Sequence, residues 1–271
     1  MDTPDERRAA SGCRSILVHL DGGVHAASRL AWARALGARL GARVEALYAT
    51  VPGPPDIETQ HQRQARLTFD AAASTPGWPL ALRTSDAQGG LSALFHAALT
   101  ADLVVVGQRD PMDAKAFDLP ADLAERLARD TGCATALVPW RAGRPLDRLE
   151  GALVAWRPDR VSAVALRGAL PLLGLARRIH LVTWSADAAS RVQDQQQVVD
   201  YLRLHGLHAI ERHEGPPPDD AGTALLTLAA AVEADLLVMG CYGHSPGREL
   251  LFGGATATVL QHMHLPVLTA H

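Results

Sequence analysis

The sequence predicts an α/β protein with a parallel sheet in each of two halves. Short runs rich in Val and Leu end in glycine, which is typical of buried parallel strands at their carboxyl ends. These runs alternate with segments whose apolar residues recur every three or four positions, as in helices that pack on a sheet. The run ADLVVVG at 101–107 returns almost letter for letter as ADLLVMG at 234–240. Matching elements recur about 131 to 136 residues apart, which indicates an internal duplication.

The composition supports this class and excludes others. The chain has 271 residues, of which 48% are apolar and 4% aromatic, and this is enough for two domains with a core each. The formal net charge of −3 leaves no basic footprint, so we expect no nucleic-acid partner. The longest apolar stretches, such as 224–232, are too short to cross a bilayer, and we expect no membrane partner. Three scattered cysteines, Cys13, Cys133 and Cys241, predict reduced thiols and a cytoplasmic protein.

Both halves follow the same order of elements. SILVHL forms the first strand and stops at Asp21, and the helix after it carries Leu30 and Leu36 on its apolar face. The breaker run VPGPP at 51–55 separates the second strand from a polar helix. The expected strands are 15–20, 43–50, 80–84, 101–107, 134–138, 151–156, 179–183, 209–213, 236–239 and 265–269. The expected helices are 26–40, 60–73, 90–100, 119–129, 160–174, 190–204, 223–232 and 255–263. The segment 139–149 contains glycine and proline among arginines and is the expected linker, which gives domains at 14–140 and 150–271.

A group of glycines lies where the strand at 236–239 gives way to the helix at 255–263. They are Gly240, Gly243, Gly253 and Gly254. Glycine lets backbone amides turn toward a ligand, and the amino terminus of a helix presents unpaired N–H groups, so phosphate suits such a place. The same residues could also form a tight turn that lets the helix pack closely on the sheet. From the residues alone, both interpretations stay open.

The spacing of these glycines resembles the nucleotide loop of the universal stress protein family, G-x2-G-x9-G-[ST], and HLPVLTAH resembles the strand that closes that domain. The resemblance implies two tandem, doubly wound, five-stranded parallel-sheet domains packed as a pseudo-dimer. It also implies an adenine nucleotide, with ATP expected, as the ligand. Gly254 stands where the family has Ser or Thr, and the next hydroxyl belongs to Thr256. The candidate nucleotide-binding residues are therefore Gly240, Gly243, Gly253, Gly254, Ala255, Thr256 and Arg157.

The two halves differ at the residues that the resemblance makes important. The first half keeps Asp21, which the resemblance places near adenine and ribose, but Asp110 replaces the second glycine and would repel phosphate. The second half keeps the glycines, but Arg157 replaces the aspartate and could contact a phosphate or stack on a base. Asp159 is either a substitute acid or a residue of the helix start. We expect a degenerate loop in the first domain and a retained loop in the second.

No metal and no catalytic residue are expected. His262 and His264 lack a Cys, Asp or Glu at a ligand spacing, and His205, His208 and His213 are spread over a helix end, a turn and a strand.

Ser245 in GHSPG matches the sequence pattern of a nucleophile elbow but lies several residues past the strand end, and no partner acid or base can be assigned to it.

The sequence and the family resemblance together predict a stress-response protein that binds its nucleotide as a regulatory ligand. A scaffold without nucleotide and a slow ATPase are the alternatives, and a second copy of the chain or another stress protein is the expected partner.

Overall fold

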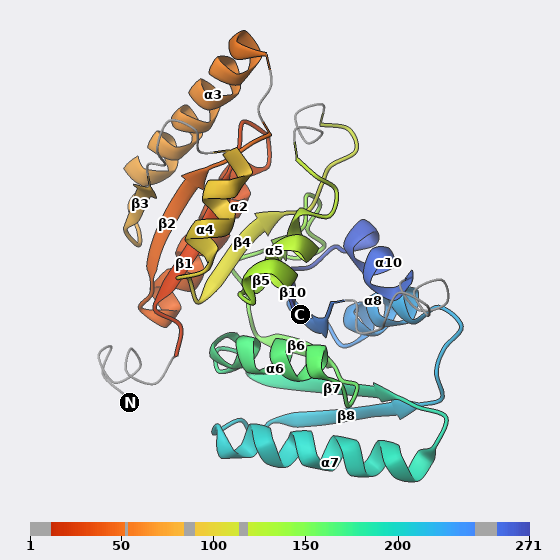
Figure 1. The fold of residues 1–271 in the computed structure, drawn as a ribbon. Helices are drawn as coiled ribbons and strands as arrows, with labels where there is room; N and C mark the ends of the chain where they lie inside the picture. Colours follow the sequence, from red (N-terminus) through yellow and green to blue (C-terminus); the bar gives the residue numbers. More distant parts are fainter. Residues whose placement is uncertain (1–11, 52–53, 84–89, 114–118, 242–253) are drawn as a thin grey trace. The chain divides into compact units, whose positions relative to one another are not determined.

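The computed structural model of the protein describes residues 12–51, 54–83, 90–113, 119–241 and 254–271. The chain divides into two compact units, Met1–Trp140 and Arg141–His271. Figure 1 shows that the described part of each unit contains one sheet and the helices that cover it.

The first unit has a parallel sheet in the order β3-β2-β1-β4-β5. The order reverses between β1 and β4, so right-handed crossovers put α2 and α3 on one face and α4 and α5 on the other. The contacts agree, because α2 packs against α3 and α4 against α5. The elements are β1 (Ser15–Leu20), α2 (Ala26–Leu40), β2 (Arg43–Tyr48), α3 (Pro55–Ser74), β3 (Leu80–Arg83), α4 (Gly90–Ala98), β4 (Leu103–Gly107), α5 (Leu123–Thr131) and β5 (Ala134–Val138).

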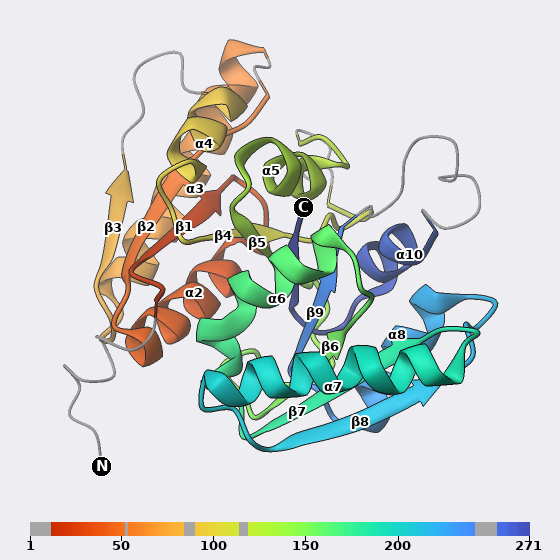
Figure 2. The same ribbon diagram turned by 60° about the horizontal axis from the view of Figure 1, so that its bottom comes forward.

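The second unit repeats this arrangement with the order β10-β9-β6-β7-β8, again all parallel. The reversal now falls between β6 and β9. Figure 2 shows α6 and α7 in front of the strands of this unit, whereas α8 packs against α10. The elements are β6 (Gly151–Ala155), α6 (Arg160–Leu173), β7 (Arg178–Trp184), α7 (Ala188–Leu204), β8 (Ile210–Gly215), α8 (Ala221–Ala231), β9 (Leu236–Gly240), α10 (Gly254–His262) and β10 (Val267–Ala270). The predicted fold, two tandem doubly wound five-stranded parallel sheets, is confirmed.

The central strands are buried on both faces, which explains their continuous apolar sequences. Val104, Val105, Leu153 and Leu237 are wholly inaccessible to solvent. How the two units pack against one another stays a prediction, as do the sequence-based domain limits. Among the described helices, none combines the length and the hydropathy that crossing a membrane requires.

Two predicted helix boundaries were wrong. The helix expected at 60–73 begins at Pro55, because proline fits the first helical position, where its missing N–H costs nothing. The helix expected from 119 begins at Leu123, because the residue before Pro120 is disfavoured in the helical region. The other boundaries lie within two residues of those expected.

One aspartate anchors the start of each unit. Asp102 Oδ2 accepts hydrogen bonds from the backbone N–H groups of Arg14 (2.7 Å) and Ser15 (2.9 Å). Asp235 Oδ2 accepts the equivalent pair from Glu150 (2.8 Å) and Gly151 (3.1 Å). Asp102 and Asp235 are the aspartates of the repeated sequence ADL. Each lies just before the fourth strand of its sheet and binds the backbone at the start of the first strand, so the repeat preserves a structural contact.

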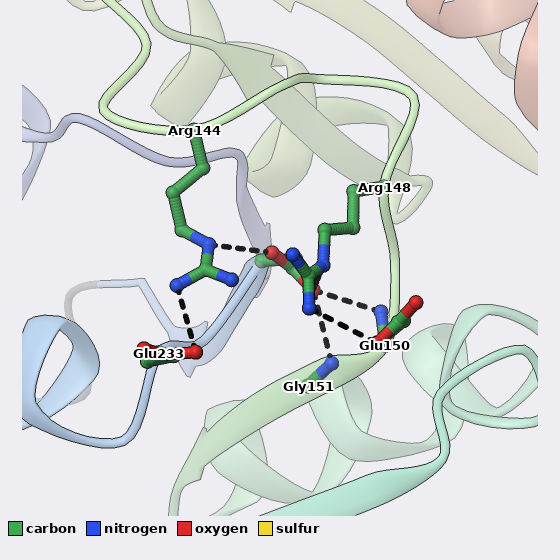
Figure 3. Close-up of polar contacts among 6 residues, drawn as sticks. Arg144, Arg148, Glu150, Gly151 and Glu233 are labelled. Carbon is green, nitrogen blue, oxygen red and sulfur yellow. Dashed lines mark hydrogen bonds and ion pairs between the residues drawn. The ribbon is translucent and has the colours of Figure 1, made fainter.

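In the second unit this anchor also holds the segment that precedes β6 (Figure 3). Arg144 Nε lies 3.2 Å from Asp235 Oδ1, and Arg144 Nη1 lies 3.2 Å from Glu233 Oε2. The Asp235 carboxylate is almost fully buried, with 2% of its side chain exposed. The last residues of the expected linker are therefore held to the sheet by ion pairs.

Candidate functional site

The candidate site lies where the strand order of the second unit reverses, between β6 and β9. In open parallel sheets, ligands bind beyond the carboxyl ends of the strands at such a point. Gly240 is the last residue of β9, Arg157 follows the end of β6, and α10 begins on the connection that leaves β9. The topology thus brings these three predicted features to one edge of the same sheet.

Gly240 is a glycine for a steric reason. A Cβ at this position would lie 2.8 Å from the backbone nitrogen of Ser162 and 2.8 Å from Cγ2 of Val161, which are both in the first turn of α6. The end of β9 therefore abuts the start of α6, and only glycine permits that approach. This close approach concerns α6 and not the helix that follows the glycines, so neither interpretation of the glycine group is decided by it, and ligand contact by the Gly240 backbone stays a prediction.

Arg157 and Asp159 form an ion pair beside the same helix start. Arg157 Nε lies 2.6 Å from Asp159 Oδ2, and the Arg157 side chain is exposed. Asp159 is the N-cap of α6, because its Oδ1 accepts a hydrogen bond of 2.9 Å from the Ser162 N–H. Of the two interpretations of Asp159, the helix-start residue is the correct one. Its carboxylate already satisfies the donor that an incoming anion would need there.

The first turn of α10 supplies the remaining described candidates. Gly254 is exposed, and no described residue outside its own helix turn has an atom within 4 Å of the position where a Cβ would lie; Ala255 is half-buried. The first N–H groups of a helix have no acceptor inside it, so this turn can hold an anion through its backbone. Thr256 is only 6% exposed, which makes its hydroxyl less suited to a ligand in solvent than the amides beside it.

Two of the predicted glycines, Gly243 and Gly253, lie outside the described residues, as does Ser245. Their role in a nucleotide loop stays a prediction.

The equivalent edge of the first unit contains charged side chains that bind one another. Arg29 of α2 is 4% exposed, and its Nη2 lies 2.9 Å from Asp21 Oδ2 while its Nε donates to the carbonyl of His19 (2.8 Å). Asp21 also accepts a hydrogen bond of 3.0 Å from the Gly23 N–H. The acid that the family resemblance places near the ribose is thus bound by a buried arginine of the same unit.

These contacts dominate the ionisation of Asp21. Burial disfavours its charged form, but the positive charge of Arg29, the neighbouring His19 and the hydrogen bond from Gly23 outweigh burial and lower the pKa of Asp21 to about 2. Burial in turn lowers the pKa of His19, so this ring is neutral near pH 7. The pair that remains charged is Asp21 with Arg29.

Gly107 at the end of β4 makes room for this arginine. A Cβ on Gly107 would overlap Nη1 of Arg29, so the glycine that ends β4 accommodates a side chain, whereas the glycine that ends β9 accommodates a helix start. Asp110 lies just beyond β4 and is 7% exposed; its Oδ2 lies 2.8 Å from His25 Nε2 and its Oδ1 accepts from the Met112 N–H at 2.8 Å. In the first unit, the Arg29–Asp21 ion pair and the Asp110 carboxylate thus lie at the switch point, which is the place where the strand order reverses between β1 and β4.

Sequence reasoning missed Arg29, because on a helix with alternating small and apolar residues it looks like an ordinary solvated arginine. The one signal available was its position, four residues before Ala33 and thus on the buried face of α2.

The fold and the site define a class, namely a duplicated parallel α/β protein whose two switch points have diverged. Residues 161–271 match the family model described as "Universal stress protein family". Residues 161–271 therefore form a domain of the universal stress protein family, and the first half of the chain repeats the fold of that domain. A search of curated proteins found no significant match.

Solved structures of similar fold cover both halves. A universal stress protein from Archaeoglobus fulgidus is 13% identical, with a TM-score of 0.67, over 94% of this chain and 96% of that chain. A protein from Pseudomonas aeruginosa described as a universal stress protein is 17% identical, with a TM-score of 0.60, over 97% and 94%. The cytoplasmic domain of a prokaryotic cation chloride cotransporter is 9% identical, with a TM-score of 0.54, over 95% and 96%. At these identities the likeness concerns the fold alone, which serves more than one kind of protein.

Proposed function

We propose that the second unit binds an adenine nucleotide, with ATP as the principal candidate, as the regulatory ligand of a cytoplasmic stress-response protein. The observation that carries the proposal is that the family match spans the whole glycine spacing, Gly240, Gly243 and Gly253. Backbone amides of this loop and of the first turn of α10 would hold the phosphates, because they present N–H groups at a helix start.

The exposed Arg157, which follows the end of β6, is a cation at this edge that a phosphate or base could recruit. Arg157 forms an ion pair with Asp159, and this reduces the electrostatic repulsion between the Asp159 carboxylate and an incoming anion. We propose that the ligand acts by differential binding and not by hydrolysis.

A second candidate function is a scaffold that binds proteins and no nucleotide. The observation in its favour is that the N–H of Ser162 at the start of α6 is already capped by Asp159 and that no acid occupies the position of Arg157. Under this alternative, the glycines serve packing alone, as Gly240 does against α6.

Isothermal titration of ATP into the full chain tests the proposal. Gly243→Asp places a carboxylate in the loop, as Asp110 does in the first unit, and we expect it to abolish the heat of binding. The matched control is Gln64→Asp, which adds the same charge to the exposed side of α3 and should bind ATP as the original chain does.

The outcomes separate the candidates. If the folded chain shows no heat with ATP, ADP or AMP, the nucleotide proposal fails and the scaffold remains. Equal heat from Gly243→Asp and the original chain would mean that the ligand sits elsewhere. Phosphate release above the blank would indicate a slow ATPase.

A further inference from the structure

A second cluster of ligand-type side chains lies on the two strands farthest from β10, away from the candidate nucleotide site. His180 of β7 and Glu211 of β8 are directly paired in the parallel register, and His213 follows two residues later on β8. Register partners and residues two apart on one strand project to the same face of a sheet. Three potential ligands therefore converge from two adjacent strands.

The distances between the donor atoms suit a single metal ion. His180 Nδ1 lies 3.1 Å from His213 Nε2 and 3.5 Å from Glu211 Oε2. In a tetrahedral site with bonds of about 2.1 Å, two ligand atoms are about 3.4 Å apart, so both distances lie near the required value. All three donor atoms lie within 4.8 Å of one another, and in the described part of the chain this is the one group of three His, Cys, Asp or Glu residues that meets this criterion.

We propose that His180, Glu211 and His213 form a binding site for a divalent transition-metal ion, with zinc as the expected ion. Two imidazoles and one carboxylate are a typical zinc ligand set, and a set of three leaves a fourth position for water. The proposal departs from the sequence-based expectation of no metal, which considered His213 only with its neighbours along the chain.

The chemistry of the cluster without metal also favours an added cation. Two imidazole nitrogens 3.1 Å apart cannot both be bare or both carry a proton without repulsion, so one shared proton must hold them together. A metal ion can replace that proton and accept both lone pairs.

The surroundings hold the ligands in place and leave one side accessible. Gln195 of α7 is buried, and its Nε2 donates to the carbonyl of His213 at 2.7 Å, which fixes the β8 backbone beside the ring. His180 is 4% exposed, whereas 56% of the Glu211 side chain is exposed. The ion would enter from the side of Glu211 and would clamp β8 to β7.

Zinc chloride titrated into the full, tag-free, EDTA-treated chain tests this site. We expect one Zn2+ per chain, detected by competition with a chromophoric chelator, and a visible Co2+ spectrum of tetrahedral type. Glu211→Gln and His213→Gln should each lower the affinity at least about tenfold, since even residues that only support a ligand contribute about 10-fold to 100-fold. Both positions are partly exposed, so these variants should fold.

The matched control is His208→Gln, which removes an exposed histidine nearby and should leave zinc binding unchanged. If the original chain takes up no zinc, or if Glu211→Gln and His213→Gln bind it as tightly as the control, the site does not exist. The test does not depend on the nucleotide, because the cluster lies on β7 and β8 and not at the β6–β9 edge.

Discussion

The buried ion pair of the first unit gives the sharpest energetic prediction, because the chain contains a matched exposed pair. Arg29 lies 2.9 Å from Asp21, with 4% and 15% of the two side chains exposed. Arg66 lies at the same 2.9 Å from Asp70, with 61% and 48% exposed. The substitutions Asp21→Asn and Asp70→Asn therefore remove the same charge at the same distance in two different environments.

The magnitude for Asp21 follows from its pKa, which falls from an ordinary 3.8 to about 2. One pKa unit corresponds to about 1.36 kcal/mol, so the charged form stabilises the fold by roughly 2 kcal/mol. Asn also leaves the buried Arg29 without its counter-ion, and breaking such a pair costs about 3–5 kcal/mol. The two figures are estimates of the same interaction, so we expect Asp21→Asn to lower the free energy of unfolding by about 2–5 kcal/mol at pH 7, and Asp70→Asn by about 0–1 kcal/mol.

Urea denaturation followed by circular dichroism measures both variants, and hydrogen exchange at pH 7 assigns the loss to the first unit. Because the folded pKa of Asp21 is depressed, its contribution is complete above the unfolded value of 3.8 and declines as the pH falls toward about 2. The gap between the original chain and Asp21→Asn should thus narrow below about pH 4. Equal, small effects of the two substitutions at pH 7 would refute the assigned role of the Arg29 pair.

Three further predictions test local contacts. Gly240→Ala should destabilise the second unit by about 1–3 kcal/mol, because its Cβ would meet the start of α6. Gly254→Ala, whose Cβ would meet no neighbouring element in the described part of the chain, should not lower the melting temperature. Asp235→Ala should cost about 2–5 kcal/mol in urea denaturation, since it leaves two backbone N–H groups and Arg144 Nε without their acceptor, although Arg144 Nη1 keeps Glu233; a loss below about 1 kcal/mol would contradict this. Glu233 has a φ of 53°, a backbone conformation that glycine adopts more easily than alanine. Both Glu233→Gly and Glu233→Ala lose the ion pair with Arg144, but the glycine variant should melt at the higher temperature, by the equivalent of about 1 kcal/mol. Equal melting temperatures would disprove backbone strain at this residue.

Much of the fold could be predicted from the sequence because short-range rules control it. ADLVVVG and ADLLVMG combine a buried strand with a terminal glycine, and both became the fourth strand of a parallel sheet. The start of α3 was wrong because a proline-rich run reads as a breaker although Pro55 is compatible with the first helical position. Local chemistry thus predicted the kind of element more reliably than its first residue.

The functional residues were harder to predict because they depend on contacts between distant segments. Arg29 meets Asp21 only because α2 folds back over β1, and its spacing from Ala33 places it on the buried face of α2 without indicating which residue it pairs with. His180 meets Glu211 and His213 through the pairing of β7 with β8, and that register is not visible in the sequence. Only one part of this cluster could be read from the sequence, namely that Glu211 and His213 are two residues apart on one strand and therefore project to the same face.

Hydrogen exchange of the full chain with and without saturating ATP tests the central claim most directly. The account predicts slower exchange in peptides that cover 236–262, at the end of β9 and the start of α10, and unchanged exchange at 103–125 in the first unit. Protection at 103–125, or no protection anywhere in the folded chain, would contradict it.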